Sequence, residues 1–228
     1  LKSFDGNVVG ITGSNGKTTT TKIIANVLSK SSSTLNNYNN EIGMPLSIFN
    51  AKQNSKNLVI EMGAAKPGDI KYLSSILKPN IGVITNIGNS HLEKLKNIKG
   101  VLKVKSELVS NIKNGGYLVV PNENKEHLKF WKKIIRGKEL ITFGTEKNAD
   151  FYAINIKSSI KKQEFNIISD KYNIDHKIKT SLSGVHNIKN ILAAFAVSYL
   201  IENSPKLFNQ RLEKSTQVRQ KQQKWIRG

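Results

Sequence analysis

A glycine-rich segment near the N-terminus holds the residue types that bind phosphate. Residues 8–21 read VVGITGSNGKTTTT, in which three glycines precede Lys17 and Thr18. N–H groups at the start of a helix attract anions, the lysine can reach outer phosphates, and the threonine hydroxyl can ligate Mg²⁺. Ile11 stands where the general P-loop pattern has glycine. The segment predicts a phosphate loop between a buried strand and a helix, and a glycine-rich turn without a ligand is the alternative.

Two further candidates follow apolar segments that are typical of strands. Residues 57–62 end near Glu61, and residues 81–85 lead through Asn86 to His91. Ligands collect at the carboxyl ends of parallel strands, so we expect Glu61 to hold Mg²⁺ directly or through water. A solvated glutamate is the alternative. By the same argument His91 is a candidate contact to a metal or a phosphate, and a purely structural histidine is the alternative.

Two other polar clusters each allow two interpretations. Asn39 and Asn40 lie among asparagine, glycine and proline residues that form either a turn or a loop facing a substrate. His186, Asn187 and Asn190 begin an alanine-rich, apolar helix, where they would cap the helix or contact a ligand.

The elements that must position these residues alternate between strand and helix. This order predicts an α/β fold with a doubly wound, mainly parallel sheet of the P-loop type. After residue 150, three short alternating segments predict a small antiparallel β patch that covers one edge or face of the sheet. We expect strands from residue 8 and over 57–62, 81–85, 117–120, 139–143, 151–156, 164–169 and 177–182, and helices over 18–30, 67–77, 98–112, 125–135 and 188–201.

Composition narrows the class of protein. Lys and Arg total 36 against 16 Asp and Glu, a formal net charge of +20, and cysteine is absent. The lysines are scattered and no aromatic-basic motif accompanies them, so we do not expect a nucleic-acid partner; an anionic small substrate explains part of the charge. No apolar run approaches the roughly 20 residues that span a bilayer. We expect a soluble, cytoplasmic monomer without disulfides.

Several ordered motifs resemble the central domain of the Mur ligases, the ATP-dependent amide ligases of peptidoglycan synthesis. The resemblance covers about residues 7–200. Its motifs are ITGSNGKTTT, NNEIGMPL, EMGAAKPGDI, TNIGNSHLE, VKSEL and SGVHNIKNILAAFA, in that order. The combination of NNEIG, MGA..PG and NIG..HLE most resembles the members that add D-alanyl-D-alanine. Other Mur ligases and folylpolyglutamate synthases share the loop and the mechanism.

The resemblance implies roles for the first group of candidates. Lys17 would neutralise phosphate charge, and Asn86 would lie near the γ-phosphate of ATP. Thr18 and Glu61 would serve one Mg²⁺, and His91 would serve a second. The ATP phosphates would lie in the backbone of Gly13, Ser14, Asn15, Gly16, Lys17, Thr18 and Thr19.

The resemblance also assigns a modified lysine. By composition alone, the lysines of the helix over 98–112 are a solvated face. Lys105 nevertheless aligns with a lysine that CO₂ carbamylates in this family, which gives a carboxylate-like group for the second Mg²⁺. Because only the neutral amine reacts, burial or neighbouring cations should lower the pKa of Lys105. Lys103 is the alternative carrier. Contacts to adenosine would come from His186, Asn187 and Asn190, and contacts to the substrate from Asn39 and Asn40.

The implied reaction joins D-Ala-D-Ala to UDP-MurNAc-tripeptide through an acyl phosphate, with ATP and two Mg²⁺ ions. We expect residues 1–204 to be the central ATP-binding domain and residues 205–228, rich in Gln, Lys and Arg, to be a basic tail that is a solvated helix or disordered. The N-terminal UDP-binding domain and the C-terminal domain of the family are not expected in this chain. We therefore expect weak ATP binding and little ligase activity; the alternative is a non-catalytic ATP-binding module whose tail contacts acidic partners.

Overall fold

One mixed β-sheet organises the molecule. The computed structural model describes residues 4–90, 92–159 and 162–226. Within them, nine strands pair in the order β2-β3-β1-β4-β5-β6-β7-β8-β9. The strands in chain order are β1 (Asn7–Thr12), β2 (Ser31–Ser33), β3 (Asn57–Glu61), β4 (Ile81–Ile84), β5 (Tyr117–Pro121), β6 (Glu139–Gly144), β7 (Phe151–Ser158), β8 (Gln163–Ser169) and β9 (Ile174–Thr180). The predicted doubly wound α/β sheet is confirmed.

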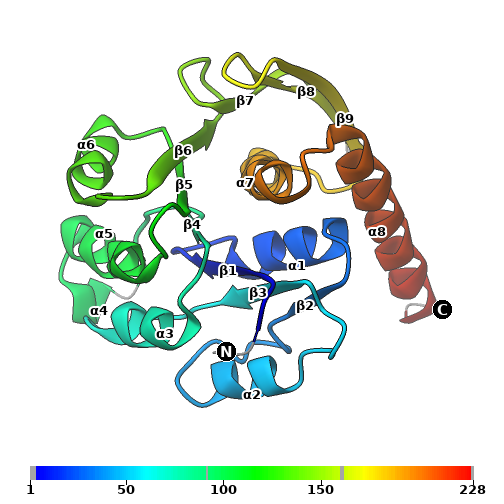
Figure 1. The fold of residues 1–228 in the computed structure, drawn as a ribbon. Coiled ribbons are helices and arrows are strands. Elements are labelled where there is room, and N and C mark those ends of the chain that lie inside the picture. The colour runs from blue at the N-terminus through cyan, green and yellow to red at the C-terminus, as the bar shows by residue number, and fades with distance from the viewer. Residues whose placement is uncertain (1–3, 91, 160–161, 227–228) are drawn as a thin grey trace.

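All neighbouring strands from β2 to β7 in this order pair in parallel. The last two pairs, β7 with β8 and β8 with β9, are antiparallel. The antiparallel segment does not lie over the parallel strands as a separate patch, because β7 pairs in parallel with β6 and extends the same sheet. In Figure 1 this extension arches over α7, which is seen along its axis. The predicted antiparallel strands are therefore present, and they form the far edge of a single sheet.

Helices cover both faces of the sheet (Figure 1). They are α1 (Lys17–Val27), α2 (Gly43–Phe49), α3 (Asp69–Leu77), α4 (Leu92–Leu95), α5 (Ile98–Ser106), α6 (Lys125–Ile134), α7 (Val185–Glu202) and α8 (Pro205–Ile226). One apolar cluster joins α1, α7 and α8 to the sheet, and a second joins α2, α3, α5 and α6 to the opposite face. Successive side chains of β1 point to opposite faces of the sheet, so the strand contributes to both clusters. Val9 and Ile11 belong to the first cluster and Val8 belongs to the second.

Three local features differ from the expectation. The helix predicted over 98–112 ends at Ser106, and a 3₁₀ helix follows over Glu107–Asn111. The polar segment after α1 contains the short edge strand β2, and the cluster that reads as a turn leads into α2. Both elements are short, and the alternation and helical spacing that identify longer elements have no room to develop in them.

Helix α8 is part of the packed structure at its first turns. Phe208 and Leu212 are buried in the same cluster as α1 and α7. The guanidinium of Arg211 donates to the carbonyl of Val27 at 2.6 Å and also pairs with Glu202. The segment predicted as a basic tail thus begins with a helix that contributes to the core. No helix among residues 4–90, 92–159 and 162–226 combines the length and apolar character needed to cross a membrane.

Candidate active site at the carboxyl ends of the strands

The predicted phosphate loop connects β1 to α1 at the centre of the sheet, between the carboxyl ends of β3 and β4. Gly13 and Gly16 have φ values of 145° and 81°, which favour glycine. A Cβ atom on Gly13 would collide with the Thr85 hydroxyl, and one on Gly16 with the Asn190 side chain. The glycines therefore let the loop pack against the end of β4 and against α7. In open α/β sheets, ligands bind outside the carboxyl ends of the strands, at the position where the strand order reverses.

The N-terminus of α1 has no side-chain cap and can therefore accept an anion. Gly16 has no side chain that could cap the helix, and the first N–H groups of a helix have no acceptor within it. The ammonium of Lys17 folds back over the loop and donates to the carbonyls of Gly13 at 3.0 Å and Ser14 at 3.3 Å. Burial lowers the pKa of Lys17, and the nearby charge of Glu61 partly opposes this shift. These groups fit the phosphates of a nucleotide.

Neighbouring loops hold the phosphate loop in place. The backbone N–H of Asn15 donates to Asn86 Oδ1 at 2.8 Å, and that of Ser14 donates to the Asn86 carbonyl at 3.1 Å. The Ser14 hydroxyl exchanges two hydrogen bonds of 3.0 Å with the backbone of Gly88. Asn86 thus has a clear place beside the loop, and its contact with a γ-phosphate stays a prediction. The candidate His91 lies outside the described residues.

Glu61 ends β3 as predicted and lies beside the first turn of α1. Its side chain is 2 % exposed, and each carboxylate oxygen accepts one hydrogen bond. Thr18 Oγ1 donates to Oε2 and Asn39 Nδ2 donates to Oε1, both at 2.8 Å. The backbone N–H of Glu61 donates to the Thr34 hydroxyl at 2.7 Å. The solvated glutamate considered as an alternative is therefore wrong.

The donors of Thr18 and Glu61 fit Mg²⁺, which prefers hard oxygen ligands and retains several waters. The Thr18 hydroxyl can donate its proton to Glu61 and still offer a lone pair. Among the described residues, no three His, Cys, Asp or Glu side chains gather into a metal site. A metal here would consequently depend on Thr18, Glu61 and the phosphates of a ligand.

Lys105 is buried at the end of α5. Its side chain is 1 % exposed, and no described residue forms a hydrogen bond or an ion pair with its ammonium. Its pKa is lowered to about 8, mainly by burial and further by the charge of Lys17, against opposing contributions from Asp69 and Glu107. Lys103, the alternative carrier of a carbamate, is exposed. The interpretation of these lysines as a solvated face therefore does not apply to Lys105, whose pKa is lowered as we expect, and its carbamylation stays a prediction.

Glu107 ties the segment of Lys105 to the start of α3. Its two carboxylate oxygens accept the backbone N–H groups of Gly68 at 2.8 Å and Lys71 at 3.0 Å. A carboxylate at a helix N-terminus interacts favourably with the helix dipole. The loop that precedes α3 is thereby fixed relative to Lys105.

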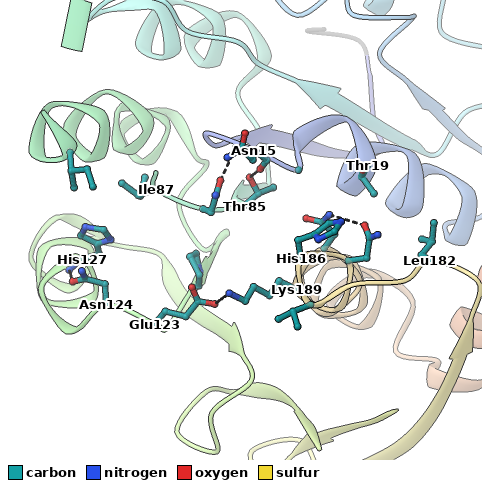
Figure 2. A pocket seen from close by; sticks show the side chains of 17 residues that line it. Asn15, Thr19, Thr85, Ile87, Glu123, Asn124, His127, Leu182, His186 and Lys189 are labelled. Atoms are coloured by element: carbon teal, nitrogen blue, oxygen red, sulfur yellow. Dashed lines mark hydrogen bonds and ion pairs between the residues drawn. The ribbon is translucent and has the colours of Figure 1, made fainter. Parts of the chain in front are cut away.

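A first cavity of about 1000 Å³ opens on one side of the phosphate loop. Figure 2 shows His127, Asn124 and Ile87 on one wall and His186, Lys189 and Leu182 on the other. Seven of the predicted nucleotide contacts line this cavity: Asn15, Gly16, Thr19, Asn86, His186, Asn187 and Asn190. The structure thus brings together residues that are almost 180 positions apart in the sequence.

The three predicted residues at the start of α7 differ in their surroundings. His186 is exposed at the cavity wall. Asn190 is 8 % exposed, accepts the Thr20 hydroxyl at 3.2 Å and packs against Gly16. Asn187 donates to the Ser183 carbonyl at 2.7 Å. Asn190 therefore fastens α7 to the phosphate loop, and His186 remains available to a ligand.

Residues that follow β5 also belong to the site, although they were not among the candidates. Glu123 forms an ion pair of 2.6 Å with Lys189, which joins the two walls of the first cavity (Figure 2). Asn124 caps α6 by accepting a hydrogen bond from the backbone N–H of His127. The ring of His127 contacts the ring of Trp131 edge to face, and burial lowers the pKa of His127. These residues follow a buried strand at the same sheet edge as Glu61, and their position after that strand is the sequence signal that could have identified them.

A second cavity of about 870 Å³ lies on the other side of the phosphate loop. Lys17, Asn39 and Asn40 line it together with the loop that precedes α3, residues 63–68, and with Tyr72. Asn39, Asn40 and Lys17 therefore face this second cavity, whereas Gly16, the residue before Lys17, lines the first. This arrangement can hold a nucleotide on one side and a second, anionic ligand on the other.

Comparison with known proteins identifies a shared family. The model of the Mur ligase middle domain matches residues 11–198. The chain is 36 % identical over 206 residues to the UDP-N-acetylmuramoyl-tripeptide--D-alanyl-D-alanine ligase of Buchnera aphidicola subsp. Acyrthosiphon pisum, covering 88 % of this chain and 45 % of that protein. The crystal structure of MurF from Acinetobacter baumannii superposes with a TM-score of 0.83 at 27 % identity, over 91 % of this chain and 45 % of the other.

MurF from Thermotoga maritima in complex with ADP superposes with a TM-score of 0.82 at 28 % identity, over 93 % of this chain and 49 % of the other. The chain thus spans less than half the length of these relatives. The family match nevertheless covers most of the sheet, the phosphate loop, Glu61, Lys105 and the start of α7. The chain therefore belongs to the Mur ligase family, and its phosphate loop with the two adjoining cavities lies in the middle domain of that family.

Proposed function

We propose that this chain supplies the ATP-binding part of an ATP-dependent ligase that joins D-alanyl-D-alanine to UDP-N-acetylmuramoyl-tripeptide in peptidoglycan precursor synthesis. The names of its relatives support this pair of substrates. The observation that carries the proposal is the convergence of Lys17, Glu61 and Lys105 beside an open helix N-terminus. This set combines phosphate binding with ligands for Mg²⁺, which phosphoryl transfer requires.

The proposed reaction has two steps. A peptide carboxylate oxygen attacks the γ-phosphorus of ATP, the bond to the bridging oxygen breaks, and ADP leaves an acyl phosphate behind. The amine of D-alanyl-D-alanine then attacks the acyl carbon, phosphate departs, and the amine loses a proton. The N-terminus of α1 would hold the phosphates beside the first cavity, and the second cavity, which Lys17 lines, would hold the carboxylate. Alignment and charge neutralisation are the contributions expected of the protein.

Carbamylation of Lys105 belongs to the same proposal. The neutral amine attacks CO₂, a nitrogen–carbon bond forms, and one proton is released. With a pKa of about 8, roughly one amine in ten is neutral at pH 7. The carbamate would give the second Mg²⁺ an oxygen ligand that the lysine itself lacks, and His91 is the other ligand we expect for this ion.

Calorimetric titration of ATP with Mg²⁺ tests the nucleotide site. We expect saturable binding that Lys17→Ala abolishes. Lys22→Ala, which removes an exposed lysine from the same helix, is the matched control and should bind as the unchanged chain does. Absence of binding at millimolar ATP would contradict the proposal.

ATP turnover tests the proposed substrates. It should require both UDP-N-acetylmuramoyl-tripeptide and D-alanyl-D-alanine when the whole protein is assayed. Binding of ATP without such turnover would favour the non-catalytic module instead. That the protein is a cytoplasmic monomer without a nucleic-acid partner, and that its domain ends near residue 204, stay predictions.

A further inference from the structure

The side chain of Asn39 contacts the buried carboxylate of Glu61, although it belongs to a loop that lines the second cavity. Its Nδ2 lies 2.8 Å from Glu61 Oε1. Its carbonyl accepts the backbone N–H of Gly63 at 2.8 Å, two residues beyond Glu61. One residue of the loop is therefore bound twice to the end of β3.

The charge and burial of Glu61 explain why this contact matters. A carboxylate that is 2 % exposed needs hydrogen-bond donors, because burial removes nearly all of its water. Thr18 satisfies one oxygen and Asn39 the other. Thr18 lies on α1, directly after the phosphate loop, so Asn39 is the described side-chain donor that holds the other carboxylate oxygen from a different segment.

We propose that Asn39 is a positioning residue that orients the Glu61 carboxylate for the metal of the nucleotide site. This inference rests on the proposed function, since it assumes that ATP binds with Mg²⁺ beside Thr18. Residues that hydrogen-bond to a metal ligand fix its orientation, and their loss typically lowers metal affinity about 10- to 100-fold. Asn39 would thus act on the metal through Glu61.

Calorimetry on the chain with its nucleotide provides a readout independent of turnover. The affinity for ATP is measured once with Mg²⁺ and once with EDTA, and the ratio of the two affinities gives the contribution of the metal. We expect Asn39→Ala and the similarly shaped Asn39→Leu to lower this ratio about 10- to 100-fold. Asn37→Ala is the matched control, because Asn37 is an exposed asparagine of the same loop. It should leave the ratio unchanged.

A double mutant separates the role of Asn39 from a general effect on the loop. Glu61→Gln should lower the ratio by itself, and adding Asn39→Ala to Glu61→Gln should lower it no further, because the contact has already lost its charged acceptor. Thermal unfolding followed by circular dichroism identifies variants that fail to fold. If Asn39→Ala fails to fold, Asn39→Leu takes its place in the double mutant.

Three outcomes are distinguishable. If the unchanged chain does not bind ATP with Mg²⁺, the proposed function fails and this inference fails with it. If the unchanged chain binds but both Asn39 variants keep the ratio within twofold, the inference alone is wrong. Additive effects of Asn39→Ala and Glu61→Gln would likewise contradict it, because independent sites add.

Discussion

Lys17 and Lys105 lie close enough for the positive charge of Lys17 to lower the pKa of Lys105. One lysine begins α1 and the other lies near the end of α5, on opposite faces of the sheet. They meet at the carboxyl ends of the strands. Like charges resist such an approach unless one amine is neutral or an anion lies between them. A carbamate on Lys105 would replace repulsion by attraction.

This relationship predicts the pH at which the carbamate forms. Carbamylation should rise with pH through about 8, because Lys105 must lose its proton to react. Lys17→Met removes a neighbouring positive charge, so the pKa of Lys105 should rise and the carbamate should form at higher pH. The ¹³C NMR signal of carbamate formed from ¹³C-labelled bicarbonate measures the midpoint. Lys22→Met, on the exposed side of the same helix, should leave the midpoint unchanged; an unchanged midpoint in Lys17→Met would refute the coupling.

Gly16→Ala should weaken ATP binding at least tenfold. The new methyl group would collide with Asn190, and the backbone φ of 81° adds strain. Calorimetry and thermal unfolding measure the two effects. Gly115→Ala is the control for strain alone, because its φ is 73° and no atom lies near its expected Cβ position. It should cost about 1 kcal/mol of unfolding free energy without changing ATP affinity. Equal ATP affinity in both variants would argue against the close contact.

Breaking the Glu123–Lys189 ion pair should weaken ATP binding more than it lowers stability. The pair joins the two walls of the first cavity, yet it is partly exposed, and such pairs contribute only about 0–1 kcal/mol to folding. Glu123→Gln, Lys189→Met and the double variant form a cycle that measures the coupling. The Glu164–Lys177 pair between β8 and β9 is the control, since disrupting it should leave ATP affinity unchanged. An effect of similar size at both pairs would indicate a general electrostatic origin.

Leu212→Ala should lower the unfolding free energy by about 2–5 kcal/mol, as expected for a leucine removed from a core. Leu212 is 0 % exposed against the cluster that contains α1 and α7. Leu207, 39 % exposed on the same helix, is the matched control, and Leu207→Ala should cost less than 1 kcal/mol. Chemical denaturation measures both. Equal small effects would mean that α8 does not belong to the folding unit.

Local sequence patterns predicted much of the fold and part of the site. The apolar run before the phosphate loop adjoins the loop, and Glu61 ends an apolar run of its own, so strand and helix patterns place all three. The burial of Lys105 could not be derived in this way, because lysines that alternate with apolar residues on a helix usually face solvent. Only the family resemblance singled it out. Tertiary packing, not composition, decided its environment.

The ion pair of Glu123 with Lys189 and the packing of α8 depend on contacts between distant segments. Nothing near Glu123 in the sequence indicates that Lys189 will face it, since their proximity arises from the order of the strands and the position of α7. Likewise, Phe208 and Leu212 are too sparse in a polar segment to predict a buried helix face. Both features became visible only when the sheet was assembled.

The phosphate loop separates two cavities, and different segments of the chain line each of them. The first is lined by the loop after β5 and the start of α7, and the second by the residues before α2 and α3. Substitutions that reshape one chamber leave the walls of the other intact. In the proposed function, selectivity for the nucleotide and selectivity for the second ligand can therefore be altered independently, by evolution or by an engineer, while the phosphate loop stays the same.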